Sequence, residues 1–526
     1  MQDLLNKKKE IVNFFMEQGI LLNHDLLIKL EDKDVFLEVS NLINNKEPQN
    51  IAVLNDRVKE LLNSEKEKKI NWTELEKLEA ITEKKGTQPQ KIYEPLTRTT
   101  DTKKNEGSKI KVIFSYKSEP KKREAQDFTN HFNSRYTSIK KILKQRLELA
   151  NTTSISRLYG KRDREQISII GMIRDKQLTK NGNYMLTLED ETAYIRAIVN
   201  KTRPDIFKLA RDMVLDEVIG LTGANGDNII FANNLFFPDI PATGEIKKSK
   251  EDGYALFLSD LHVGSKYFLE NDFNRFLKWI NQELGNEAQR ETASKVKYVF
   301  VLGDLVDGCG IYPGQDKELT IKDINKQYEE CANLLRQIPQ NIKLIICPGN
   351  HDAMRVAEPQ LPIYKDFSEP IYNLPNAIIV SNPAIVNIHS TEEFPGFDVL
   401  IYHGYSFDYY VADVDSIRNN GGYDRADLIM KFLLQKRHLA PTHASTLYVP
   451  DPDEDPLVIN KVPDFFVSGH IHKAAAANYR NVTLLSGSCW QSKTTFQEKV
   501  GHNPEPSRVP IINLQTRQIK MLRFGK

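Results

Sequence analysis

The first part of the chain carries apolar residues at helical spacing. Between residues 4 and 62 they recur three and four positions apart, as at Ile11, Phe14 and Phe15, so that they share one face of a helix. The pattern predicts a small α-helical module, which we assign to residues 1–75.

The segment that follows loses this pattern. Residues 64–123 are rich in Lys, Glu and Thr, and they hold too few apolar side chains to offset the entropy lost on ordering. We therefore expect a flexible charged linker over residues 76–125. Its one apolar stretch, residues 110–116, fits either a short strand or a docking segment.

A helical pattern returns over residues 128–149, now with many basic residues, and short apolar or alternating runs follow it. Asn181-Gly182 and Asn225-Gly226 are hairpin signals between such runs. The pattern predicts five strands with a helix over residues 203–214 between the third and the fourth, the order of an OB-fold β-barrel. Such a barrel either binds single-stranded nucleic acid or serves as a protein-interaction module. We assign the basic helix and the OB-fold to residues 126–248.

From Tyr254 onward, buried-strand runs end in polar loops, as in YALFLSDLH, KYVFVLGDLVD and IKLIICPGNHD. Helical stretches separate these runs, which is typical of an α/β domain whose polar groups gather at the carboxyl ends of its strands. We assign this domain to residues 249–526, where chemistry is to be expected.

Five loops of this domain carry Asp, His and Asn in a fixed order, and each follows an apolar strand. Any one of them is a weak signal, because a single Asp or His after a strand is commonly a cap or a surface residue. The five pieces together are hard to explain as ordinary loops. They are Asp260-x-His262, Gly303-Asp304-x-x-Asp307, Gly349-Asn350-His351-Asp352, His403-Gly404 and Gly469-His470-x-His472.

These side chains fit a centre that holds two divalent cations. Carboxylate and imidazole ligands together suit Mn²⁺, Fe²⁺ or Zn²⁺, and the lack of thiolates disfavours a structural zinc site. Two cations held by a shared carboxylate favour in-line displacement at phosphorus and supply a nucleophile near neutral pH. The sequence therefore predicts phosphoester hydrolysis with two metal ions. We expect Mn²⁺ first, with Fe²⁺, Zn²⁺ or Mg²⁺ as alternatives.

At these residues the sequence resembles the calcineurin-like metallophosphoesterases, whose complete motif pattern is present. The resemblance implies a two-sheet αββα sandwich in which Asp304 bridges the metals. It implies that His351 contacts the phosphate and protonates the leaving oxygen, while Asp352 orients His351. Asp307 could be a metal ligand or a loop cap, and we favour the loop cap. The metal ligands that the resemblance implies are Asp260, His262, Asp304 and His472 for one ion, and Asp304, Asn350, His403 and His470 for the other.

The composition limits the kinds of partner and the cellular location that we expect for this protein. The 526 residues include 72 Lys and Arg against 71 Asp and Glu, a formal net charge of +1, which excludes a wholly basic nucleic-acid coat but not a local basic surface. No apolar run approaches the roughly 18 residues of a membrane span, and the start lacks signal-peptide character. Four cysteines without a C-x-x-C pair argue against a disulfide framework. We expect an intracellular, cytoplasmic protein with no membrane contact.

The order of the domains adds a second resemblance. A basic helix, an OB-like barrel and a phosphoesterase domain form the layout of the small subunits of archaeal family D DNA polymerases and of the related eukaryotic B subunits. Residues 132–147, 259–265 and 431–441 also resemble this family. The last stretch has no equivalent in general phosphatases.

This resemblance implies a 3′-to-5′ proofreading exonuclease subunit, because the eukaryotic B subunits have lost metal ligands whereas every ligand position is filled here. It also implies a large catalytic subunit as partner, together with DNA and the sliding clamp. The helical module and its linker would then be a tethered recruitment element.

Contacts to DNA are open on sequence alone. The basic positions after residue 139 fit a surface for DNA or the large subunit, or simply a solvated face; they are Lys140, Lys141, Lys144 and Arg146. Tyr184 and Tyr194 could stack on bases, but aromatic residues on strands more often belong to the core.

Two other functions compete with the exonuclease. One is a non-catalytic scaffold subunit that keeps metals for stability. The other is a stand-alone metallophosphatase acting on a small phosphoester or a phosphoprotein, because the motifs alone do not select the substrate.

Overall fold

The computed structural model describes Leu21–Leu22, Val53–Leu54 and residues 109–525, except 120, 162, 243–244 and 500–501. The expected helical module and most of the linker therefore lie outside the described residues. The chain divides into two compact units, Met1–Asp101 with Lys493–Asn503, and Thr102–Ser492 with Pro504–Lys526. The first contains the parallel pair β1 (Leu21–Leu22) and β2 (Val53–Leu54) and the helix α14 (Thr495–Lys499).

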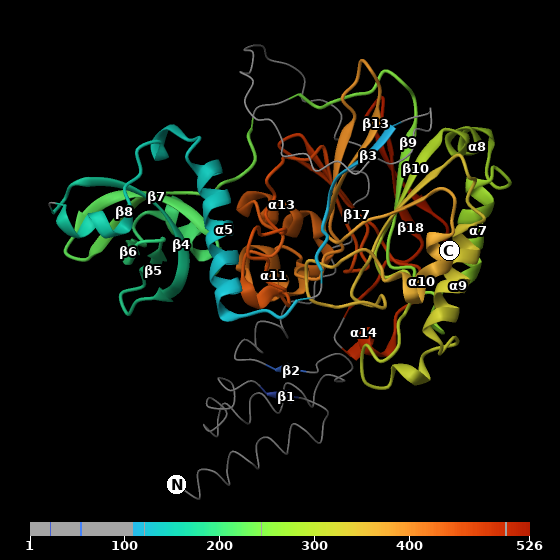
Figure 1. The fold of residues 1–526 in the computed structure, drawn as a ribbon, viewed down its shortest axis with the longest axis horizontal. Helices are drawn as coiled ribbons and strands as arrows, with labels where there is room; N and C mark the ends of the chain where they lie inside the picture. The colour runs from blue at the N-terminus through green and yellow to red at the C-terminus, as the bar shows by residue number, and fades with distance from the viewer. Residues whose placement is uncertain are drawn as a thin grey trace, which may run out of the picture. The chain divides into compact units, whose positions relative to one another are not determined.

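The second unit contains two six-stranded mixed sheets (Figure 1). The first sheet has the order β12-β11-β10-β9-β18-β19, with β9 to β12 parallel and the last two strands antiparallel. Its strands are β9 (Tyr254–Leu258), β10 (Val296–Leu302), β11 (Lys343–Cys347), β12 (Ala377–Ile379), β18 (Arg508–Asn513) and β19 (Ile519–Arg523).

The second sheet has the order β16-β17-β15-β14-β13-β3, with β14, β15 and β17 parallel to one another. Its strands are β3 (Lys109–Ser115), β13 (Ala384–Ser390), β14 (Phe397–Ile401), β15 (Phe465–Ser468), β16 (Ala475–Tyr479) and β17 (Val482–Ser486).

Alternating residues of the strands fill separate cores. On β9, Ala255 and Phe257 face the core shared with Val399 and Phe465 of the second sheet, whereas Leu256 packs on the helical side. This two-residue period explains the continuous apolar runs, since both faces of each central strand are buried. The layers are thus helices, sheet, sheet and helices.

The helices on the first sheet are α7 (Glu270–Ile280), α8 (Glu287–Ser294), α9 (Ile324–Leu335) and α10 (Lys365–Tyr372). On the second sheet lie α11 (Phe407–Asp413), α12 (Asp415–Arg418) and α13 (Ala426–Lys436). Short 3₁₀ turns occur at Gln315–Lys317, Gly422–Asp424 and His443–Ser445.

Residues 166–236 form a closed barrel in the order β4-β5-β6-β8-β7. Its elements are β4 (Gln166–Leu178), β5 (Tyr184–Glu189), β6 (Tyr194–Val199), α6 (Pro204–Arg211), β7 (Val218–Gly226) and β8 (Ile229–Phe236). The predicted five strands and intervening helix are present. One turn is displaced, because Gly226 pairs with Ile229 and the two-residue loop is Asp227-Asn228 instead of Asn225-Gly226.

The basic helix α5 (Ala125–Leu143) precedes the barrel and is followed by 3₁₀ turns at Leu147–Leu149 and Ile155–Gly160. Its apolar face packs against the barrel, where the Tyr136 hydroxyl donates to the carbonyl of Ile170 at 3.0 Å. The guanidinium of Arg135 is fully buried against Asp455, which lies between α13 and β15, with Nε and Oδ2 2.6 Å apart.

Strand β3 lies inside the region expected to be a linker. It pairs antiparallel with β13 and forms an edge of the second sheet. Of the two alternatives for the apolar stretch at residues 110–116, the structure has the strand. The four cysteines are free, and no helix of the described residues is long and apolar enough to cross a bilayer.

Candidate metal centre

The predicted ligands follow the carboxyl ends of five strands from both sheets. The loops after β9, β10 and β11 belong to the first sheet, and those after β14 and β15 belong to the second. Six of the predicted ligands form two groups, and within each group the ligand atoms lie within 4.8 Å of one another. They are Asp260, His262 and His472, all buried, and Asp304, His403 and the partly buried His470. His262 forms a third such group with Asp307 and His351.

In the first group, the Nε2 atoms of His262 and His472 face each other at 3.1 Å. Nε2 of His472 lies 3.5 Å from Oδ1 of Asp260. In the second group, Nε2 of His403 lies 3.0 Å from Oδ1 of Asn350 and 3.4 Å from Oδ2 of Asp304. Donor atoms with lone pairs thus converge from seven side chains.

Asp304 connects the two groups. Its Oδ2 atom lies 3.4 Å from His403 and 3.9 Å from Nε2 of His262, while its Oδ1 accepts the backbone N–H of His351 at 2.8 Å. Burial raises the pKa of Asp304, but the neighbouring imidazoles, His403 first, hold it well below its ordinary value. A carboxylate in this position suits the bridging role that the resemblance implies.

The backbone at the site is unusual. Five of the predicted ligands have φ in the left-handed region: Asp260 (51°), His262 (51°), Asp304 (50°), His470 (72°) and His472 (53°). Such conformations cost free energy for residues with a Cβ and concentrate where side chains are held for function.

Two motif glycines make room for the carboxylates. A Cβ on Gly349 would lie 2.2 Å from Oδ1 of Asp304, and one on Gly469 would lie 2.6 Å from Oδ2 of Asp260. The backbone could not approach so closely with any larger residue.

Hydrogen-bond acceptors behind the histidines determine which nitrogen faces the site. Nδ1 of His403 donates to the carbonyl of Leu302 at 2.8 Å, and Nδ1 of His351 donates to the carbonyl of Asp307 at 2.8 Å. Because a carbonyl only accepts, each Nδ1 carries a proton, and in the neutral ring Nε2 keeps its lone pair.

Asp307 lies behind His262, with its Oδ1 3.2 Å from Nδ1 of the ring. The same carboxylate accepts the side-chain amides of Gln491 at 2.8 Å and Gln315 at 3.0 Å. The structure therefore places Asp307 as a support of His262, which the loop-cap interpretation did not anticipate.

The relation of Asp352 to His351 differs from the expectation. The Asp352 carboxylate accepts from the backbone of Gly349 at 2.8 Å and from the hydroxyl of Tyr328 at 3.0 Å. Burial, followed by the charge of Asp304, raises the pKa of Asp352 to about 7. The His351 ring is oriented by the carbonyl of Asp307 and not by Asp352, which supports the loop backbone instead.

Asp408 on α11 belongs to the site but has no place in the sequence motifs. Its Oδ2 lies 2.9 Å from Nε2 of His470, and the ring of Tyr405 lies 5.8 Å from that imidazole. Asp408 lies within α11, so the strand-loop pattern could not have identified it. Tyr405 does lie in the loop after β14, but tyrosine is not among the residue types that the pattern selected.

The basic residues proposed for DNA contact lie at the surface or partly buried. Lys140 is 3.5 Å from Glu191 and lies over the Tyr136 ring, 4.7 Å from its centre. Lys141 and Lys144 are exposed, and Arg146 is half-buried.

The two tyrosines proposed as stacking residues differ in their exposure to solvent. Tyr194 is 55% exposed. Tyr184 packs on Phe207 of α6, with ring centres 4.8 Å apart, at the margin of the barrel core. The core alternative therefore applies to Tyr184 more than to Tyr194.

The donor set fits divalent cations, which calcineurin-like phosphoesterases use. Opposed Nε2 atoms at 3.1 Å and a shared carboxylate are an arrangement that positive ions between them would stabilise. Oxygen and nitrogen donors are both present, so the identity of the metal does not follow from the ligands.

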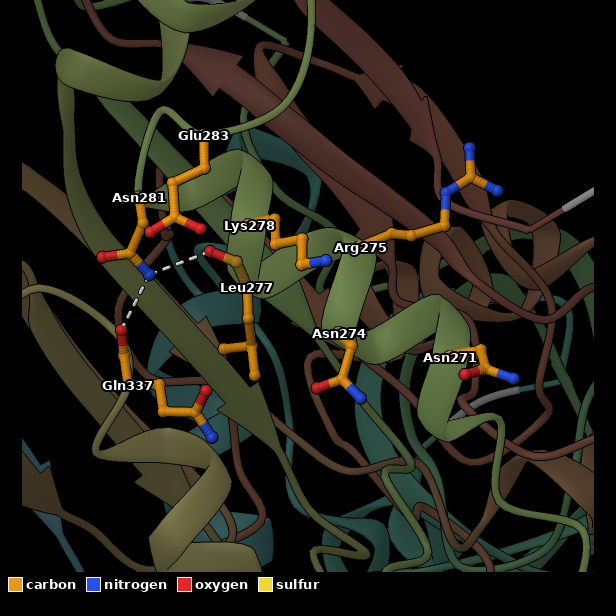
Figure 2. Close-up of a pocket in the computed structure, with 8 residues that line it drawn as sticks. All are labelled: Asn271, Asn274, Arg275, Leu277, Lys278, Asn281, Glu283 and Gln337. Carbon is orange, nitrogen blue, oxygen red and sulfur yellow. Dashed lines mark hydrogen bonds between the residues drawn. The ribbon is translucent and has the colours of Figure 1, made fainter.

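A hollow in the surface has none of the predicted ligands among its lining residues (Figure 2). Most of its lining residues are polar and lie on α7 or directly after it, and Glu283 and Gln337 complete the lining. The side-chain amide of Asn281 caps the C-terminus of α7 by donating to the carbonyl of Leu277, and it also donates to the carbonyl of Gln337, each at 2.9 Å. Its lining residues include no histidine and a single carboxylate, so it does not resemble a metal site.

Comparison with known proteins identifies the domain that carries these residues. The family model of the calcineurin-like phosphoesterases matches residues 254–474. A solved structure described as a novel archaeal phosphodiesterase aligns with 51% of this chain and 98% of its own at 12% identity, but its TM-score of 0.26 supports no argument.

Relatives with a known name are much more similar. The DNA polymerase II small subunit of Methanothermobacter thermautotrophicus is 40% identical over 402 residues, which cover 76% of this chain and 80% of the relative. The protein of that name from Pyrococcus abyssi is 39% identical, and the match spans 63% of its length. The chain therefore belongs to the DNA polymerase II small subunit family and carries a calcineurin-like phosphoesterase domain.

Proposed function

We propose that this chain is a 3′-to-5′ proofreading exonuclease that hydrolyses the terminal phosphodiester of a DNA strand. The observation that carries the proposal is the complete ligand set, with Asp304 shared between the two groups of donors. Five of these ligands are held in backbone conformations of the kind that concentrate at functional sites, which favours a catalytic centre.

The proposed reaction uses the residues in distinct roles. Two divalent ions, when bound, supply an activated water and offset the negative charge that develops on the phosphate. His351 borders the ligands, with its ring centre 4.7 Å from that of His262. Its Nδ1 proton is held by the Asp307 carbonyl, so a protonated ring presents Nε2–H to the leaving 3′ oxygen.

The other parts of the chain fit work on DNA as a polymerase subunit. The closed barrel has the strand and helix order of an OB-fold, which can guide a single strand by stacking and phosphate contacts. Exposed Tyr194 and the basic positions at the end of α5 are its candidate contacts. The relatives' name, small subunit, supports a large catalytic subunit as partner. The sliding clamp as a further partner and the cytoplasm as location belong to the proposal as well.

Digestion of a primer with a mismatched 3′ end, with Mn²⁺ and with chelator, tests the proposal. Asp304→Ala and His351→Ala should each reduce the exonuclease activity by about 100-fold or more, as expected for the loss of a bridging ligand and of a general acid. Asp316→Ala, at an exposed site, is the control.

Three results would contradict the proposal. Unchanged digestion by both variants would exclude this site as the nuclease. A chain that binds metal yet degrades no DNA end would be a scaffold. Fast hydrolysis of an aryl phosphate monoester, without association with a large subunit, would indicate a stand-alone phosphatase.

A further inference from the structure

A groove lined by aromatic side chains lies beside the metal centre. Its volume is about 800 Å³, and we call it the aromatic groove. Its walls come from α5, from α11 and the residue Tyr405 before it, from the 3₁₀ turn Gly422–Asp424, and from residues 443–448. The lining residues with rings are Phe128, Tyr405, Tyr409, Tyr423, His443 and Tyr448.

The inner end of the groove contacts a predicted metal ligand. Tyr405 and Asp408 both line the groove, and both touch His470, through the ring contact at 5.8 Å and the carboxylate contact at 2.9 Å. A molecule in the groove would therefore extend directly from a phosphate held at the metal centre.

The outer part of the groove is a firm aromatic surface. His443 stacks on Tyr448 with ring centres 5.2 Å apart and planes 17° apart, and Phe128 meets His443 edge-on at 5.9 Å. Tyr448 is fixed in turn, because its hydroxyl accepts from Arg135 at 3.1 Å and donates to the carbonyl of Ala440. Rings that are already fixed lose little entropy when a flat ligand stacks on them.

The charge of the lining selects the kind of ligand. No Lys or Arg is among the twelve lining residues, all of which the structure describes, and Asp408 is the one carboxylate. Phosphate groups would gain nothing from such walls, whereas every nucleobase has a face that can stack on aromatic rings.

We propose that the aromatic groove binds the bases next to the 3′ end of single-stranded DNA while the terminal phosphodiester lies at the metal centre. The inference rests on the proposed exonuclease function and adds to it the site that holds the strand. It also predicts a preference for frayed ends, because paired bases are not free to enter the groove.

The test uses the full chain and two groove residues that do not contact His470. Tyr409→Ala, Leu447→Ala and the double variant are compared with Tyr409→Phe, which keeps the ring, and with Tyr364→Ala, an exposed tyrosine outside the groove. Leu447 is 59% exposed, so its replacement affects folding little. The substrates are a single-stranded oligonucleotide, the same strand with abasic residues near its 3′ end, and bis(p-nitrophenyl) phosphate, which has no base.

We expect the double variant to raise KM for the natural oligonucleotide about tenfold, as the loss of base stacking predicts. Hydrolysis of bis(p-nitrophenyl) phosphate should stay unchanged, and the abasic strand should no longer distinguish the double variant from the parent. Tyr409→Phe and Tyr364→Ala should behave as the parent.

A parent chain that digests DNA, with groove variants of equal KM, would overturn the inference while leaving the exonuclease in place. Loss of binding to the large subunit, again with KM unchanged, would show that the groove holds a protein partner instead. A parent chain that digests no DNA would overturn the proposed function and this inference together.

Discussion

The residues behind the predicted ligands matter as much as the ligands themselves. Asp307 approaches His262 from the side away from the other donors and is itself fixed by two glutamine amides. A carboxylate in this position fixes the orientation of the ring and keeps the proton on Nδ1. It also makes the lone pair of Nε2 a stronger metal ligand.

Replacing Asp307 should therefore weaken metal binding without removing a ligand. For Asp307→Asn we expect a 10- to 100-fold loss of Mn²⁺ affinity or activity, about the size typical of such supporting residues. A Mn²⁺ titration of nuclease activity and of calorimetric binding measures both. Asp316→Asn, on the exposed face of the same loop, is the matched control. Equal Mn²⁺ affinity of the two variants would show that Asp307 does not support the ligand.

At this scale the sequence predicted the positions that follow strands and missed those that do not. The predicted donors of both groups converge because apolar strands bring their loops to one place. Asp408 comes from a helix, and its contact with His470 depends on how α11 packs. Likewise, the adjacency of His351 and Asp352 in the sequence suggested a pair, but their side chains have different partners.

At the scale of elements, hydrophobic periodicity predicted the strands well and their ends less well. The barrel has its five strands, yet one hairpin turn lies two residues beyond the Asn225-Gly226 signal. Strand β3 was ambiguous because seven residues in a charged region give no periodic pattern, and only the exposed edge of β13 makes them a strand.

Helix α5 is joined to the phosphoesterase part by a buried polar cluster of Arg135, His131, His438 and Asp455. His438 donates from Nε2 to Asp455 at 2.8 Å and accepts the backbone N–H of Ala440 on Nδ1 at 3.0 Å. Both nitrogens are thus used by the neutral ring. Burial, followed by the charge of Arg135, lowers the pKa of His438 to about 4.

This cluster should make folding sensitive to acid. An unfolded chain protonates His438 near its ordinary pKa of about 6.5, whereas the folded chain resists protonation until about pH 4. The unfolded state therefore binds more protons in this window, and stability falls as the pH decreases from 6.5 to 4, by up to about 3 kcal/mol from this group. Urea unfolding across that range measures the loss.

The control for this pH dependence is a pair of variants. His438→Gln keeps a donor for Asp455 but cannot titrate, so its stability should depend less on pH than that of the parent. His443→Gln, at an exposed position, should retain the full dependence. Identical pH profiles for all three proteins would exclude His438 as the cause.

At the scale of the whole molecule, the formal net charge near zero says nothing of a site whose local charge depends on bound metal ions. Lys and Arg exceed Asp and Glu by only one residue, which by itself gives DNA little attraction. Asp260 and Asp304 are fully buried carboxylates within the cluster of imidazoles, and bound divalent ions would make this place attractive to a phosphate backbone.

Removing divalent ions should therefore weaken both stability and DNA binding. Mn²⁺ at a hundred times its dissociation constant would stabilise the folded chain by about 2.7 kcal/mol relative to chelator, and the melting temperature should rise with its concentration. Affinity for a single-stranded oligonucleotide, measured at fixed ionic strength with Ca²⁺ to slow cleavage, should rise in parallel. Asp304→Ala should lose both gains, because it removes the carboxylate that serves both groups of donors. Equal DNA affinity with ions and with chelator would mean that the strand is held by the barrel and the basic helix, and not by the metal centre.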